Sequence, residues 1–375
     1  MNANARCVLL SLVICVLPFM QNALAVTGSQ YPDSKTPYLG VYRWSIGANG
    51  GVNGNEAFAR WMGLKVVWGE DFMPSDQWVN NIEGGGWQLA PWAAWKRATR
   101  GARMIFSVPM LPGPWDRSGI AEGSGVKEPV SLQDGAKGVY NSHFKKLAEN
   151  LIKAGLGDSI LRLGWEFNGG WYAWRASDDP SAFAAYWRQI VKTMRAIPGG
   201  QNLRFCWNPA LGWLSFPAEK AWPGDDYVDY VGLDVYDESW APGTYPIPSI
   251  ATPQMINAIH QEVWNDVILN GDHGLKFWSV FASQHHKPFA IPEWGVSDRA
   301  DGHGGMDDPF FIRKMGDFIY DPSNHVYFDC YFDVQAGDGH HQLSPGVSGK
   351  EKTEFPKSAM LFRKLFGKNS GDSKK

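Results

Sequence analysis

Excess charge and cysteine are both scarce in this 375-residue sequence. Lysine and arginine number 35 against 38 aspartate and glutamate, which leaves a formal net charge of −3. Such a balance provides no electrostatic footprint for nucleic acid or for an anionic membrane. No Gly-x-Ser-x-Gly segment occurs either, so a serine esterase built on a nucleophile elbow is not indicated.

After the N-terminus, no apolar run is long enough to span a membrane. At the N-terminus itself, Arg6 precedes the apolar run CVLLSLVICVLPFM, and ALA at 23–25 offers a small-x-small cleavage site. This arrangement is typical of a secretory signal peptide, and the run is short for a membrane anchor. We therefore expect residues 1–25 to be a signal peptide and the mature protein to be secreted or periplasmic.

Only four cysteines are present, and two of them, Cys7 and Cys15, belong to the expected signal peptide. The other two, Cys206 and Cys330, lie inside apolar, strand-like runs. Buried free thiols are the favoured interpretation, although a disulfide between them stays possible. Two cysteines cannot staple a chain of this length, so a large core must stabilise it.

Tryptophan, by contrast, is abundant, with 19 residues, and aromatic residues make up 14% of the chain. Indole rings offer flat apolar surfaces that also donate a hydrogen bond, a combination that suits sugar rings. Part of this aromatic content is expected simply to fill the core.

Strand-like and helix-like segments alternate along the chain, which argues for a parallel sheet with crossover helices. Eight such units predict an α/β fold of the (β/α)₈ TIM barrel type, whose sites lie at the carboxyl ends of the strands. A doubly wound open sheet is the alternative, but the glycine-rich segment 46–56 lacks the strict spacing of a phosphate-binding turn. We expect one catalytic domain over 26–367 and a disordered tail over 368–375. The predicted strands are 38–44, 64–71, 103–110, 159–166, 203–209, 228–236, 287–295 and 326–334.

Two glutamates end predicted strands. Glu166 follows the fourth, which carries an arginine inside its apolar run, and Glu293 ends the seventh. Strands four and seven face each other across an eight-stranded barrel, so the two carboxyls could converge at the ~5 Å spacing of a retaining glycosidase. Close carboxyls do not both ionise easily, so one pKa rises and that group becomes the acid. A lone strand-end glutamate can equally be a surface ion-pair member, and Asp234, at the end of strand six, could replace either.

Four segments resemble glycoside hydrolase family 26. RLGWEFNGGWYAW is similar to the acid/base segment of that family, FCWNP to its fifth strand, YVDYVGLDVY to its sixth, and KPFAIPEWG to its nucleophile strand. The resemblance implies a (β/α)₈ barrel, retaining chemistry and a mannanase-like activity. It implies that Glu166 is the acid/base and Glu293 the nucleophile, with Tyr236 holding the nucleophile and Asp234 touching substrate or supporting that tyrosine.

The resemblance also predicts contacts with substrate. Trp171, five positions after the acid, would stack in the cleft. Independently of the resemblance, the loop after strand eight lies on the catalytic side, so its His341 could bind a distal sugar. Mannanases of the family usually have histidine immediately before the acid, but this chain has Trp165, which suggests a divergent branch. The full set of expected substrate-binding residues is Trp165, Asn168, Trp171, Trp174, Trp207, Asn208, Asp234, Tyr236, Trp294 and His341.

The sequence therefore predicts a secreted glycosidase that cuts a β-linked polysaccharide internally, with β-mannan or a related hemicellulose or β-glucan as substrate. We expect no cofactor and no metal, because Asp338, His340 and His341 lack recognisable ligand spacing. We also expect a monomer that binds neither nucleic acid nor membrane. The alternatives are a hydrolase of the producer's own exopolysaccharide and a non-catalytic carbohydrate-binding barrel.

Overall fold

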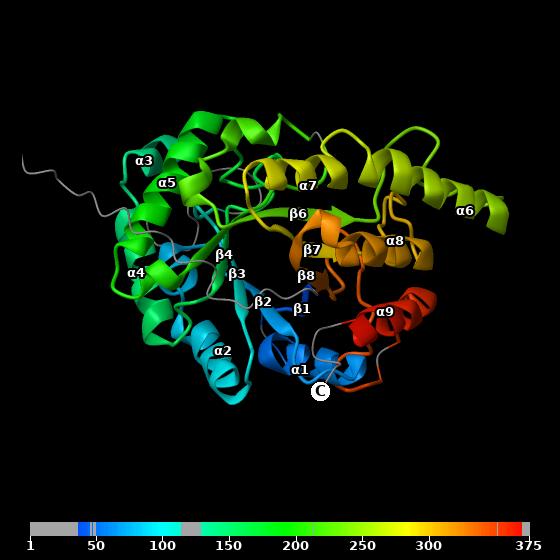
Figure 1. Ribbon diagram of the computed structural model, residues 1–375, viewed down its shortest axis with the longest axis horizontal. Coiled ribbons are helices and arrows are strands. Elements are labelled where there is room, and N and C mark those ends of the chain that lie inside the picture. The colour runs from blue at the N-terminus through cyan, green and yellow to red at the C-terminus, as the bar shows by residue number, and fades with distance from the viewer. Residues whose placement is uncertain are drawn as a thin grey trace, which may run out of the picture. The chain divides into compact units, whose positions relative to one another are not determined.

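The computed structural model describes residues 37–45, 47, 50–113, 129–212, 214–350 and 352–369. Within these residues, eight parallel strands close into a barrel in the order β1 to β8, with β1 pairing with β8 (Figure 1). The predicted (β/α)₈ barrel is confirmed, and the open-sheet alternative is wrong. The predicted signal peptide lies outside the described residues, as do residues 370–375 of the predicted tail.

Each predicted strand is present, although most are shorter than the sequence suggests. The strands are β1 (Tyr38–Tyr42), β2 (Trp68–Phe72), β3 (Met104–Val108), β4 (Ile160–Leu163), β5 (Arg204–Trp207), β6 (Tyr230–Tyr236), β7 (Phe289–Gly295) and β8 (Val326–Phe332). The α-helices are α1 (Gly51–Met62), α2 (Gly86–Ala98), α3 (Leu132–Ala136), α4 (Asn141–Lys153), α5 (Pro180–Arg195), α6 (Pro253–Glu262), α7 (Leu275–Gln284), α8 (Pro309–Tyr320) and α9 (Pro356–Asn369).

Helix α5 illustrates how local sequence sets these boundaries. The Asp179 side chain caps the helix by accepting a hydrogen bond from the backbone N–H of Ala182, and Pro180 occupies the first turn. Apolar residues at helical spacing, such as Phe183, Trp187 and Ile190, are buried against the barrel. None of the helices in the described part of the chain is long and apolar enough to cross a membrane.

The barrel interior changes from apolar to polar along the strands. Near the amino ends, an apolar layer contains both Cys206 and Cys330, which are free and buried, so the disulfide left open by the sequence does not form. Towards the carboxyl ends the inward-facing side chains become charged or polar. They are Glu70, Ser107, Arg162, Asn208, Asp234 and Glu293, all buried.

Candidate active site

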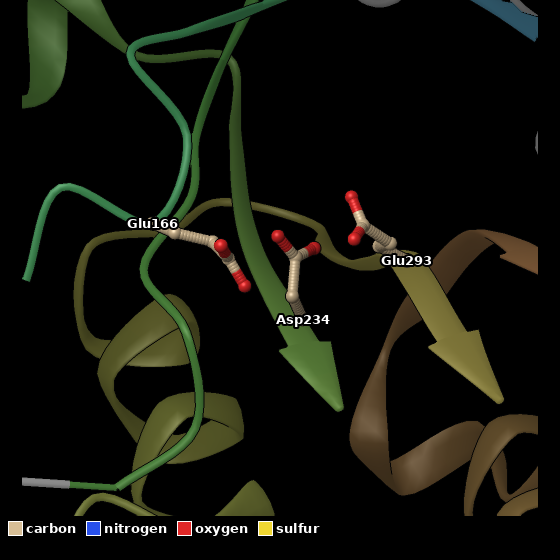
Figure 2. Close-up of side chains that lie close together, drawn as sticks. All are labelled: Glu166, Asp234 and Glu293. Carbon is tan, nitrogen blue, oxygen red and sulfur yellow. The ribbon is translucent and has the colours of Figure 1, made fainter. Parts of the chain in front are cut away.

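Three carboxyl groups converge at the carboxyl ends of the strands. Glu166 follows β4, Asp234 lies on β6 and Glu293 lies on β7, and one oxygen from each lies within 4.8 Å of the others (Figure 2). Asp234 and Glu293 are register partners on neighbouring strands. The meeting of Glu166 with Glu293 across the barrel mouth is the arrangement that the strand positions predict.

Glu166 lies in a turn rather than at a strand end, because β4 stops at Leu163. Its backbone is left-handed, with φ of 50°, a conformation that strains a residue with a side chain by about 1 kcal/mol or more. The turn is fixed by two backbone hydrogen bonds, from the N–H of Glu166 to the carbonyl of Asn208 (2.8 Å) and from that of Gly169 to the carbonyl of Glu166 (2.9 Å). The strained turn points the Glu166 carboxyl group across the carboxyl end of the barrel, towards Asp234 and Glu293.

The Glu166 carboxyl group is suited to donate a proton. Burial, followed by the charge of Glu293, raises its pKa to about 8. The indole N–H of Trp171 donates a hydrogen bond to Glu166 Oε2 at 3.1 Å, which fixes the orientation of this carboxyl group. Trp171 was expected only to stack against substrate, so this contact adds a second role for a half-buried side chain.

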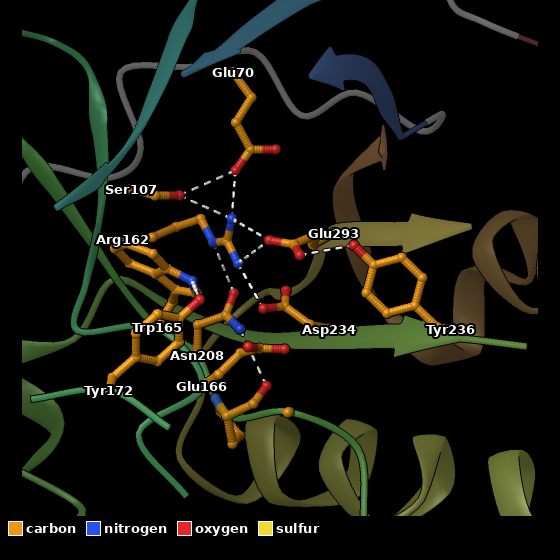
Figure 3. Close-up of polar contacts among 12 residues, drawn as sticks. Glu70, Ser107, Arg162, Trp165, Glu166, Tyr172, Asn208, Asp234, Tyr236 and Glu293 are labelled. Atoms are coloured by element: carbon orange, nitrogen blue, oxygen red, sulfur yellow. Dashed lines mark hydrogen bonds and ion pairs between the residues drawn. The ribbon is translucent and has the colours of Figure 1, made fainter. Parts of the chain in front are cut away.

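Glu293 is held by different partners. The Tyr236 hydroxyl donates to Glu293 Oε1 at 2.7 Å, as predicted, and both terminal nitrogens of Arg162 lie 3.1 Å from Glu293 Oε2 (Figure 3). These contacts fix the carboxylate in one orientation. The two glutamates therefore lie in unlike surroundings, which is what distinct acid and nucleophile roles require.

Arg162 has a central place that sequence reasoning did not assign. Its buried guanidinium donates to Asp234 Oδ2 (2.6 Å), Ser107 Oγ (2.9 Å) and Asn208 Oδ1 (3.1 Å), and it also pairs with Glu70 and Glu293. The single guanidinium thus pairs with three carboxyl groups, those of Glu70, Asp234 and Glu293. Burial, opposed by Arg162, raises the pKa of Glu70 to about 7 and that of Asp234 well above its ordinary value. The sequence feature that could have indicated this role is the occurrence of an arginine among the apolar residues of β4.

Comparison with known proteins identifies relatives in sequence and in fold. The family model described as glycosyl hydrolase family 26 matches residues 132–262, a stretch that includes Glu166, Asp234 and Tyr236. A modular endo-β-1,4-mannanase of family 26 from Cellulomonas fimi superposes with a TM-score of 0.56 at 17% identity, covering 90% of this chain and 71% of that one. A family 26 β-mannanase from Bacteroides ovatus gives a TM-score of 0.53 at 14% identity, covering 90% of each chain. These findings support a divergent member of glycoside hydrolase family 26.

The curated relatives that this chain matches differ in the sugars that their names give. A β-1,3-xylanase from an Alcaligenes species is 30% identical over 114 residues, which is 30% of this chain and 23% of that protein. A mannan endo-1,4-β-mannosidase from Bifidobacterium adolescentis is 26% identical over 226 residues, which is 57% of this chain and 21% of that protein. The chain thus spans less than a quarter of the length of either relative.

The residue before Glu166 is the position at which this sequence departs from the expected mannanase pattern. Trp165 is 5% exposed, and its indole N–H donates to the Tyr172 hydroxyl at 2.8 Å. Its ring packs edge-on against Phe72, with centroids 5.2 Å apart. Because this N–H is used inside the protein, the hydrogen bond that the usual histidine would offer has no equivalent at this position.

Three tryptophans predicted to bind substrate are buried instead, with exposed fractions of 1% or less, so those predictions are wrong. Trp207 and Trp294 follow inward-facing residues, and because side chains alternate along a strand they point outward into the helical layer. There Trp207 contacts Trp278 on α7, and Trp294 donates to Asp329 Oδ2 at 3.1 Å. Trp174 stacks on Tyr172 and donates to the Trp165 carbonyl.

The two asparagines are also buried, and substrate contact by Asn168 is wrong. Its amide donates to the carbonyl of Ala210 and accepts from the N–H of the same residue, each at 2.8 Å, so it ties the loop after β4 to the loop after β5. Asn208 faces the barrel interior, where its side chain bonds Arg162 and its carbonyl accepts from the Glu166 N–H. Both asparagines therefore position other groups.

His341 and Asp234 are buried and contact other residues of the site. His341 is 3% exposed, and its ring packs on Tyr236 with centroids 4.6 Å apart, so the predicted contact with a distal sugar is corrected to support of the tyrosine. Burial lowers the pKa of His341 to about 4, so the neutral ring donates from Nδ1 to the Val296 carbonyl at 2.7 Å. Asp234 bonds Arg162 rather than Tyr236.

Proposed function

We propose that this protein is a retaining glycoside hydrolase that cleaves β-mannan or a related β-linked polysaccharide. The observation that carries the proposal is the pairing of Glu166 and Glu293, whose nearest oxygens come within 4.8 Å. Retaining glycosidases have carboxyl groups roughly 5–5.5 Å apart, whereas inverting enzymes need about 6.5–9.5 Å to admit a water molecule. The spacing supports direct attack by one carboxylate.

The proposed reaction has two steps. In the first, a Glu293 oxygen bonds to the anomeric carbon as the glycosidic C–O bond breaks, and Glu166 gives its proton to the departing sugar oxygen. In the second, water attacks the same carbon, Glu166 takes a proton from that water, and the ester bond to Glu293 breaks. Tyr236 and Arg162 hold Glu293 throughout, and Trp171 holds Glu166.

The substrate class comes from the family and its relatives, which include proteins named as β-1,4-mannanases and as β-1,3-xylanases. Trp165 argues for a cleaved-site sugar contact unlike that of the usual mannanase, so both polymers belong in the proposal. Internal cleavage and export also belong to the proposal, the latter on the sequence of residues 1–25 alone.

A substrate screen tests this function. Purified protein is incubated with β-1,4-mannan, β-1,3-xylan, mixed-linkage β-glucan and bacterial exopolysaccharide, and new reducing ends and product sizes are measured. We expect at least one of the plant-type polymers to be cut into intermediate lengths, and the Glu293→Gln variant to be inactive on it. Binding without any new reducing ends would instead support a non-catalytic barrel, and cleavage of exopolysaccharide alone would contradict the proposed substrate class.

The pH dependence follows from the acid. Glu166 must carry its proton to assist the leaving group, and its pKa is about 8. We therefore expect kcat/KM on polymer to fall as pH rises through about 8, approaching a tenfold loss per pH unit above that value. A pH–rate profile of the unaltered protein measures this limb. Activity that keeps rising well above pH 8 would assign the acid role elsewhere.

A further inference from the structure

Exposed tryptophans of the described residues follow the carboxyl ends of barrel strands. Among the described residues, three indoles are strongly exposed: Trp44 (44%), Trp87 (44%) and Trp240 (58%). Trp44 follows β1, Trp87 lies at the start of α2 after β2, and Trp240 follows β6. All three come after the carboxyl end of a strand, the end of the barrel at which Glu166 and Glu293 meet. Single exposed apolar residues need no explanation, but an arrangement confined to the catalytic end does.

Trp240 is the most exposed of the three, and its ring is also the best supported. The imidazole of His303 stacks on the indole, with centroids 5.3 Å apart and planes 23° apart. The guanidinium of Arg299 lies 5.1 Å from the centroid of the same ring. An exposed indole that is braced by two neighbours loses little conformational entropy when a ligand stacks on it.

The two braces are themselves fixed. Arg299 bonds Asp301 (Nη2 to Oδ2, 3.0 Å) and Glu238 (Nη1 to Oε1, 3.4 Å). His303 donates from Nδ1 to the Ser239 carbonyl at 2.8 Å, and its own carbonyl accepts from the Ser239 N–H at 3.1 Å. These bonds join the loop after β6 to the loop after β7, so the platform around Trp240 is built from two segments of the barrel mouth.

The platform is also joined to the catalytic pair. Trp240 lies four residues after Tyr236, which bonds Glu293, and four extended residues reach at most about 14 Å. The Asp237 N–H donates to the Gly295 carbonyl, and Ser297 Oγ donates to Glu238 at 2.8 Å, so the intervening chain follows the rim of β7. A polysaccharide chain bound at Glu166 and Glu293 would extend as far as Trp240 within a few sugar units.

We propose that Trp240 is a stacking platform for a sugar residue of the bound polysaccharide, several units away from the cleaved bond. The inference rests on the proposed function. A single indole is too small for a protein-binding patch, whereas its flat face matches the C–H face of one pyranose ring. The polar edge formed by Arg299, His303 and Asp301 offers hydrogen bonds to ring hydroxyls.

The test compares activity across chain length. Kinetics are measured on β-1,4-mannan and its oligosaccharides from disaccharide to hexasaccharide, and on the β-1,3-xylan series in parallel, for the unaltered protein, Trp240→Ala and Trp240→Tyr. We expect Trp240→Ala to raise KM on the polymer and the longest oligosaccharides about five- to tenfold, with kcat little changed and the shortest cleaved substrate unaffected. Trp240→Tyr keeps a flat ring and should recover most of the loss.

Two controls separate the possible failures. Ile250→Ala changes an apolar residue that lies in the same loop and is 85% exposed, and it should behave as the unaltered protein at every length. Glu293→Gln should abolish turnover; if it does not, or if the unaltered protein cleaves neither series nor mixed-linkage β-glucan, the proposed function fails and this inference fails with it. If Glu293→Gln is inactive while Trp240→Ala matches the unaltered protein at all lengths, or loses activity equally at all lengths, the platform alone is overturned.

Discussion

Replacing Glu293 with glutamine is expected to lower kcat on the cleaved polymer by at least about 10⁴-fold. The amide has almost the same shape as the carboxylate. Its single carbonyl oxygen can still accept hydrogen bonds from Arg162 while its NH2 group lies beside the Tyr236 hydroxyl, so the variant should fold. It cannot, however, supply the electron pair that bonds to the anomeric carbon. Initial rates of reducing-end release by the purified variant measure the loss.

A matched control for that experiment is Glu149→Gln, which makes the same chemical change at an exposed side chain on α4. This variant should keep the activity of the unaltered protein. Circular dichroism and thermal unfolding of Glu293→Gln should show a folded protein. Near-normal turnover by folded Glu293→Gln would show that Glu293 is not the nucleophile.

Replacing Glu166 with glutamine is expected to lower kcat on polymer by about 10²- to 10⁴-fold, because the leaving sugar oxygen then departs without a proton. The loss should be much smaller for the first step on an aryl glycoside with an acidic phenol, since that leaving group needs no proton. The alkaline limb near pH 8 should also disappear. Pre-steady-state release of the phenol separates the two steps. An equal loss on both substrate types would contradict an acid role.

The stability of Glu166→Gln provides the control for folding. The pKa of Glu166 is about 8 in the folded protein against 4.5 for a glutamate in water. Unfolding therefore releases its proton between these pH values, and the contribution of Glu166 to stability declines as pH rises from about 4.5 to about 8. The glutamine variant should thus unfold at no lower temperature than the unaltered protein near neutral pH. A variant that lost activity by unfolding would fail this check.

Sequence reasoning succeeded where chemistry follows directly from position along a strand. Alternating strand and helix patterns predicted the closed barrel. Glu166, Glu293 and Tyr236 were expected to lie together because each is polar at or beyond the end of an apolar run, and the structure brings them together. The predicted substrate contacts of Trp207 and Trp294 were wrong, although the alternation of side chains along a strand excludes them. Asn208 and Glu293 face inward, so the neighbouring tryptophans face outward.

Other features depended on how loops fold back, which spacing does not reveal. Asn168 and Trp174 lie in the same segment as the acid, but the chain turns them into the protein, where one ties two loops together and the other stacks on Tyr172. The role of Arg162 required knowing that Glu70, Asp234 and Glu293 all point at one place in the barrel. Only the assembled barrel brings those carboxyls together.

The central claim is that Glu166 and Glu293 act as an acid and a nucleophile through a covalent intermediate. Its most direct test is to incubate the protein with a 2-deoxy-2-fluoro glycoside that carries an acidic leaving group, and to locate the attached sugar by mass spectrometry of peptides. We expect one sugar, bound to Glu293, in protein that has lost activity. A sugar attached to another residue, or inverted products with no attached sugar under any condition, would contradict it.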